Sequence, residues 1–103
     1  MDNHVALAAK LLGDRIRQAR VELGMSQEGI AGLAGMHVTN FGKIERGRAN
    51  PSLLTIVRIA TALDTDVATL TQDITRDHLP SGMRVLSARD YLSERARRSR
   101  RSP

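Results

Sequence analysis

The chain has 103 residues, a net charge of +5 and no cysteine, so it has room for about one domain and can form neither disulfide bonds nor a thiolate metal site. No apolar run approaches the roughly 18 residues that a membrane span needs, and the acidic, histidine-containing start of the chain is unlike a secretory signal. We therefore expect a cytoplasmic protein without a membrane partner.

The positive charge is concentrated at the C-terminus. Residues 93–103 contain five arginines and one glutamate, whereas residues 13–70 contain seven basic and six acidic side chains. Net basicity is therefore weak evidence for a nucleic-acid surface on the folded part of the chain. What matters there is whether the cations share one face.

A first helix is predicted to start at about Val5 or Leu11 and to end at Leu23, ahead of Gly24. Its apolar residues follow at intervals of four, three and four, the period of one helix face. They are Leu12, Ile16, Ala19 and Leu23.

A second helix is predicted between Ser26 and Gly35. The Ser26 hydroxyl can accept a backbone N–H as an N-cap, and Gly35 can adopt the left-handed conformation that ends a helix. The residues expected to face the core are Ile30, Leu33 and Ala34.

A third helix is predicted over about residues 37–45. Phe41 and Ile44 lie three residues apart and are expected to face the core. The residues expected to face outward are Val38, Thr39, Gly42, Lys43 and Arg46.

Beyond a loop of residues 46–51, Ser52 is expected to cap a fourth helix. A short fifth helix over about 66–70 closes the predicted core. No alternating strand pattern bounded by hairpin turns occurs before residue 80, so the predicted fold class is all-α. The expected apolar residues of the fourth helix are Leu53, Ile56, Val57, Ala60 and Leu63.

Residues 72–103 are predicted to form a C-terminal extension that begins with a turn or linker at Pro80, Ser81 and Gly82. Within it we expect a short amphipathic helix over 87–98 and a basic mobile tail. The apolar stripe of that helix is too small to fold alone, so it must dock on something or stay mobile. In an alternative arrangement, Met83, Val85 and Leu86 pair as a short strand in a dimer.

Between Leu12 and Leu70 the sequence resembles the phage repressor and Cro-like helix-turn-helix family, often called the XRE type. The resemblance rests on the segments RQARVELGMSQ, IAGLAGMHVTNFGKIERG and NPSLLTIVRIATAL. It implies a five-helix repressor-like domain over residues 11–71, with residues 1–10 as an N-terminal extension or the start of helix one.

The resemblance further implies a sequence-specific regulator of transcription, such as a repressor or autoregulator. Such a protein binds double-stranded DNA as a homodimer, at a palindromic operator with half-sites about one helical turn apart. Residues 26–34 would cross the DNA backbone, and residues 37–45 would be the recognition helix in the major groove.

The resemblance assigns individual contacts by position in the motif. Lys43 can donate to guanine O6 and N7, Thr39 can donate or accept, and the methyl groups of Val38 can touch a thymine methyl. The phosphate-facing residues that it implies are Gln27, His37, Asn40, Arg46 and Arg48.

Three further expectations concern the support of the recognition helix. By motif position, Arg20 and Glu45 should form an ion pair that links helix one to its end. His37 stands where the family usually has serine or threonine, so it either contacts phosphate or acts as a neutral helix cap. Gly42 lies inside the helix, either for close approach to DNA or because no side chain is needed there.

No enzyme is expected, because no nucleophile with a base, no paired carboxylates and no phosphate-binding loop are visible. His4 and His78 have no partner at ligand spacing, so neither a metal nor a cofactor is expected. The alternative function is an antitoxin-like or regulator-binding module in which residues 83–98 bind a protein partner and DNA binding is secondary.

Overall fold

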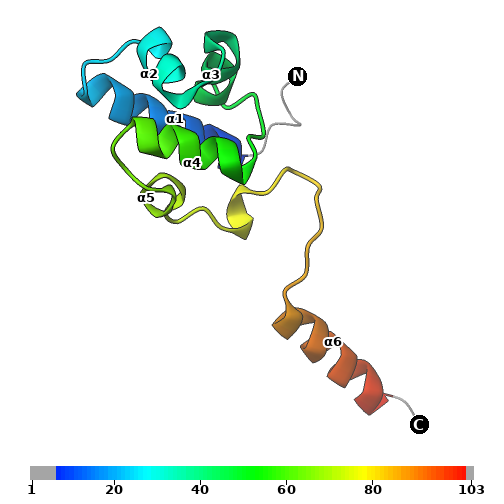
Figure 1. The fold of residues 1–103 in the computed structure, drawn as a ribbon. Coiled ribbons are helices and arrows are strands. Elements are labelled where there is room, and N and C mark those ends of the chain that lie inside the picture. Colours follow the sequence, from blue (N-terminus) through cyan, green and yellow to red (C-terminus); the bar gives the residue numbers. More distant parts are fainter. Residues whose placement is uncertain (1–6, 102–103) are drawn as a thin grey trace.

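The computed structural model describes residues 7–101, and within that range every regular element is helical (Figure 1). Helices α1 to α5 pack together as one domain, while α6 stands away from it. The predicted all-α fold class is therefore confirmed. The elements are α1 (Leu7–Glu22), α2 (Gln27–Ala34), α3 (Val38–Glu45), α4 (Leu53–Ala62), α5 (Val67–Thr71), a 3-10 turn (Arg76–His78) and α6 (Ala88–Arg101).

Side chains that accept backbone N–H groups set the starts of the domain helices. Ser26 caps α2 through the amide of Gly29 at 2.9 Å, and Ser52 caps α4, as predicted. Asp66 caps α5, and the hydrogen bonds it accepts from Thr69 lower the pKa of its carboxyl. Because each cap joins residues only three apart, local sequence sets where these helices begin.

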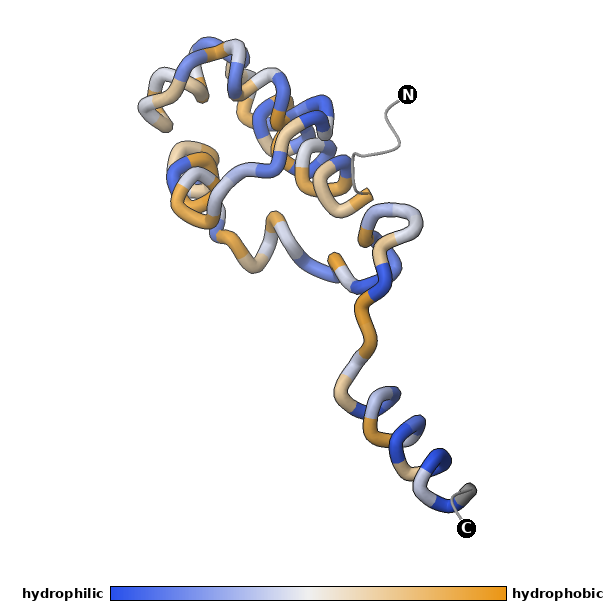
Figure 2. Tube along the Cα trace, turned by 90° about the vertical axis from the view of Figure 1, so that its right-hand side faces the viewer, coloured by the Kyte–Doolittle hydropathy of each residue, from blue (hydrophilic) through white to orange (hydrophobic). Residues whose placement is uncertain are grey.

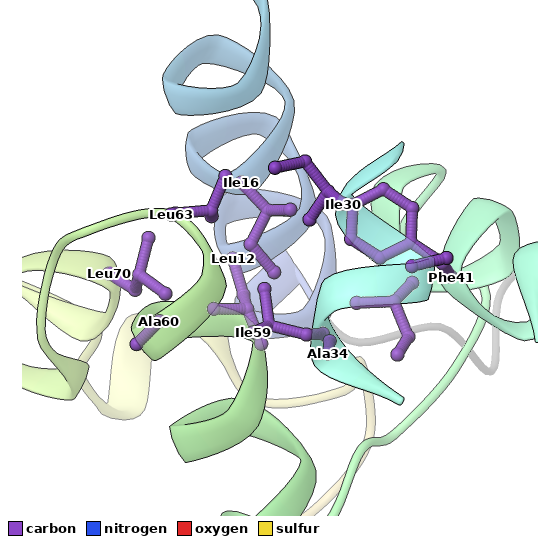
Figure 3. Packing of buried hydrophobic residues seen from close by; sticks show 11 residues of the cluster. Leu12, Ile16, Ile30, Ala34, Phe41, Ile59, Ala60, Leu63 and Leu70 are labelled. Carbon is purple, nitrogen blue, oxygen red and sulfur yellow. The ribbon is translucent and has the colours of Figure 1, made fainter. Parts of the chain in front are cut away.

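The core lies between the five domain helices and is almost entirely aliphatic. Each of these five helices contributes one of the largest fully buried side chains (Figure 3). Phe41 and Ile44 face inward, as predicted. The largest side chains are Phe41, Ile16, Ile30, Ile59 and Leu70.

The predicted core was wrong at four leucine and valine positions. The side chains of Leu23, Leu33, Leu53 and Val57 are exposed. In α2 the small residue Ala31 faces the core instead of Leu33, and in α4 Ile59 is fully buried. Both helices carry apolar residues over a wider arc than their neighbours cover, so spacing alone does not identify the buried side.

Helix α1 packs against the end of α3 at backbone contact distance. A Cβ atom on Gly13 would lie 2.4 Å from the carbonyl oxygen of Ile44 and 2.5 Å from that of Glu45. A Cβ on Gly47, which has a φ of +72°, would lie 2.7 Å from the Cα of Lys10. Two glycines therefore allow α1 to touch both α3 and the turn that follows it.

We expect Gly13→Ala to destabilise the domain by at least about 2 kcal/mol, because neither carbonyl can move without shifting α3 against α1. Gly32→Ala is the matched control. Its Cβ would meet nothing within 4 Å, so it should stabilise the domain by about 0.5 to 1 kcal/mol. Urea unfolding followed by circular dichroism measures both changes. Equal effects of the two substitutions would contradict the close packing.

The C-terminal extension forms a longer helix than the sequence predicts. The Ser87 hydroxyl accepts the amide of Asp90 at 3.0 Å, and α6 then continues to Arg101 instead of ending at residue 98. The segment expected as a mobile tail is therefore helical as far as Arg101. Residues 83–86 form no strand in the described part of this chain.

Candidate nucleic-acid interface

The outward side of α3 is polar and solvent-exposed. Thr39, Asn40 and Lys43 are exposed, whereas Val38 is half-buried and packs against the core cluster. Phe41 and Ile44 hold the opposite side of the helix in the core. Three of the side chains predicted to contact DNA are therefore accessible to a large ligand, and Val38 is partly so.

Three predicted residues line one shallow depression of about 410 Å³ beside α3. These are His37, Asn40 and Lys43, which come from the cap and the body of the helix. The far side of the depression is formed by the loop before α4 and by α4 itself, through residues that sequence analysis missed. Those residues include Asn50, Thr55 and Arg58.

The segment from α3 to the start of α4 presents only positive charge to solvent. Residues 38–52 contain three basic side chains, Lys43, Arg46 and Arg48, all of them exposed. The one acid in that segment, Glu45, is 4% exposed. A nearly neutral domain therefore has a local cationic surface at the end of α3, which suits a polyanion.

Three hydrogen-bond donors bind the buried carboxylate of Glu45 and offset the cost of burying its charge. Arg20 Nε lies 2.6 Å from Oε2 and Arg20 Nη2 lies 3.1 Å from Oε1, so the expected ion pair is present in a two-bond geometry. Gln27 Nε2 donates to Oε1 at 2.9 Å. Arg20 also donates to the carbonyl oxygen of Met25 at 2.9 Å. The network joins α1, the loop after it, the start of α2 and the end of α3.

The electrostatics of the pair favour the charged guanidinium. Hydrogen bonding to Glu45 raises the pKa of Arg20, burial opposes that rise, and Coulombic attraction to Glu45 adds to it. Gln27, predicted to face phosphate, also donates one N–H of its amide to Glu45. Its position in the motif matches that prediction, and its geometry also makes it part of the support of α3.

We expect Glu45→Gln to cost about 3 to 5 kcal/mol of folding free energy, because it leaves the Arg20 guanidinium partly buried without an anionic partner. The matched control is Glu94→Gln, which removes the exposed pair with Arg97 and should change stability by less than about 0.5 kcal/mol. Chemical denaturation of full-length variants measures both. A Glu45→Gln cost as small as that of the control would show that the network does not hold the fold.

His37 caps α3. Its Nδ1 accepts the backbone amide of Thr39 at 3.1 Å, so the neutral ring carries its hydrogen on Nε2. Histidine thus takes the capping position at which the family usually has serine or threonine. Its exposed side chain lines the depression, so capping and contact with a ligand are compatible.

Arg58 fixes the turn between α2 and α3, a role that sequence analysis missed. Its Nε donates to the carbonyl oxygen of Ala34 at 2.9 Å, and its Nη2 donates to that of Gly35. These carbonyls end α2, where a cation is favoured by the helix dipole. The positive φ of Gly35 and this guanidinium together set the angle at which α3 leaves the turn.

Gly42 was expected to face outward, and it is buried there beneath the Arg46 side chain. A Cβ at this position would lie 3.0 Å from Nη1 of Arg46, so the Arg46 side chain folds back across the helix over the glycine. The missing side chain thus makes room for a guanidinium. Arg48 differs from the other cations because it lines a separate, mostly apolar groove next to the start of α1.

No metal centre competes with this interpretation in the part of the chain that the structure describes. There, no group of three or more histidine, cysteine, aspartate or glutamate side chains is placed to hold a metal ion. None of the described helices is long and apolar enough to cross a membrane.

Comparison with known proteins identifies the domain. A family model for the helix-turn-helix domain matches residues 11–72, more than half of the chain. Control protein C.SmaI from Serratia marcescens is 36% identical over 61 residues, which cover 59% of this chain and 73% of that protein. The HTH-type transcriptional regulator DdrOP3 from Deinococcus deserti is 36% identical over 83 residues, 75% of this chain and 64% of that protein.

A solved structure supports the same assignment. The restriction-modification controller protein C.AhdI from Aeromonas hydrophila superposes with a TM-score of 0.59 and 40% sequence identity, covering 60% of this chain and 94% of that one. These relatives are regulatory proteins by name. The chain therefore belongs to the helix-turn-helix family of DNA-binding regulators of transcription.

Proposed function

We propose that this regulator recognises a specific duplex sequence by placing α3 in the major groove. The observation that carries the proposal is the accessible polar side of α3, within residues 38–52, whose one acid is buried. Lys43 then donates to guanine O6 or N7, Thr39 bonds a base edge, and the methyl groups of Val38 pack on a thymine methyl. Phosphate oxygens would be bound by His37, Asn40, Arg46 and Arg48.

Gln27 has two roles in this proposal. Its amide nitrogen donates one N–H to Glu45, which supports α3, and its second N–H is assigned to a phosphate oxygen. The same support makes recognition rigid, because Arg20, Gln27 and Glu45 fix α3 before DNA arrives. A helix that is already fixed in its binding orientation loses little conformational freedom when it binds DNA, which favours affinity.

The proposed active form is a homodimer on a palindromic operator in the cytoplasm. A two-fold pair of α3 helices reaches two half-sites about one helical turn apart. Occupying such an operator hinders or recruits polymerase, and so controls transcription as a repressor or autoregulator does. The relatives that are named as controllers and transcriptional regulators support this mode of action.

Selection of bound sequences from a random duplex pool tests the proposal. For the wild-type chain we expect an inverted repeat whose half-sites are centred about 10 base pairs apart. For Lys43→Ala we expect relaxed preference at one position of each half-site, a loss of about 1 to 3 kcal/mol for the preferred base.

The control is Arg46→Ala, assigned to phosphate, which should weaken binding to all sequences about equally and lower the salt dependence. Recovery of no consensus from the wild-type selection would contradict sequence-specific binding. Uniform weakening by Lys43→Ala would contradict its assignment as a base-reading residue.

A further inference from the structure

An apolar groove of about 800 Å³ lies on the other side of residues 49–51 from the depression beside α3, and the same three residues line both. Its walls come from α1, the loop before α4, α4 itself and the segment that follows α5. Most of its lining residues are apolar and half-buried, so they present part of their apolar surface to the groove. The apolar lining residues include Ala8, Leu12, Pro51, Ile56, Ile74 and Leu79.

The same chain carries an apolar helix side that nothing covers. On α6, Ala88, Tyr91, Leu92 and Ala96 follow at helical spacing, and the Tyr91 and Leu92 side chains are 53% and 56% exposed. Figure 2 shows hydrophobic segments on the connection to α6 and on α6 itself, outside the domain. An isolated 14-residue helix is marginal in water, so α6 needs a surface to pack on.

We infer that two copies of this chain exchange their C-terminal helices, so that the Tyr91 and Leu92 side of each α6 packs into the apolar groove of the other copy. This inference rests on the proposed homodimer for its second copy, and it adds the surface that forms the dimer. Exchange of identical elements between protomers gives a closed two-fold assembly, in which both grooves and both helices are covered.

Pairing of α6 with the α6 of the second copy is disfavoured by charge. The helix contains six arginines and two acids, and Arg95 lies four and three residues after Tyr91 and Leu92, on the same side. Two such helices would bring like charges together. The segment beside the groove carries two exposed acids, Asp73 and Asp77, and one exposed arginine, Arg76, and Arg48 lines the groove itself. The charges there are nearly balanced, so an arginine-rich helix meets less repulsion in the groove than on a second α6.

Docking of α6 into the groove of its own chain is opposed by the connection. Met83 lines the groove, and only residues 84–87 separate it from α6, so the start of α6 lies at most about 18 Å from Met83. Arg76 Nη1 lies 3.4 Å from Oδ2 of Asp90, but both side chains are exposed, so this pair adds little to the position of α6. From its start the helix runs away from the domain (Figure 1).

Tyr91 reports on this docking without a label, because the chain has one tyrosine and no tryptophan. Its fluorescence quenching by acrylamide and the sedimentation mass should be measured for the full-length chain, without DNA, over a dilution series. We expect Tyr91 to be protected while the chain is dimeric and to become accessible as the mass falls to that of the monomer. A monomer at all concentrations, an accessible Tyr91 in the dimer, or protection independent of mass would each overturn the inference.

Variants locate the two sides of the interface. Leu92→Asp on the helix and Ala8→Glu in the groove should each weaken dimerisation at least tenfold, whereas Ser93→Asp, with the same charge change on a neighbouring side, should leave it within twofold. Ala8 lies in the first turn of α1, where an acid suits the helix dipole, and circular dichroism checks that each variant folds. Loss of dimer with Leu92→Asp but not with Ala8→Glu would place α6 elsewhere and overturn the groove assignment.

The outcome is separable from that of the proposed function. Base preference at Lys43 is measured on DNA, and the mass and Tyr91 accessibility are measured without it. A monomeric Leu92→Asp variant that still selects a half-site would leave the α3 proposal standing. A dimer with a protected Tyr91 that selects no DNA sequence would contradict the α3 proposal and support the α6 interface.

Discussion

The structure depends on one buried carboxylate. Glu45 ends α3, and its two oxygens are bound by Arg20 from α1 and Gln27 from α2, so one side chain ties three helices together. Gly13 allows α1 to approach the carbonyls of the same turn of α3. Because an unpaired buried charge is costly, α3 has little freedom to rotate without breaking this network. The position of α3 is thus set by contacts within the folded domain.

The same burial shapes the electrostatics of the surface. The domain has almost no net charge, yet its one acid between residues 38 and 52 is withdrawn into the network, and three cations remain outside. Arg46 lies across Gly42, and Lys43 faces the depression beside α3. A scaffold interaction therefore also removes the negative charge that would repel a phosphate backbone. The burial of Glu45 therefore both supports α3 and leaves the surface beside it positively charged.

Local signals made much of this architecture predictable. Ser26, Ser52 and Gly35 set helix ends through contacts a few residues away, and the spacing of Phe41 and Ile44 identified the inner side of α3. The ion pair of Arg20 with Glu45 came from family resemblance, since their separation in sequence gives no sign of it. Other features depend on distances between helices, which spacing does not encode. These are the close approach at Gly13, the carbonyl partners of Arg58, and the burial of Ala31 and Ile59 in place of Leu33 and Val57.

The central claim is that α3 is already set at its binding angle in the free protein. Residual dipolar couplings of the backbone amides of α1 and α3, measured with and without a selected operator duplex, test it most directly. The structure predicts that the α1–α3 angle fits both data sets without change, because the Glu45 network is intact in both states. A reorientation of α3 against α1 on binding DNA, or averaging of the α3 couplings in the free protein, would contradict it.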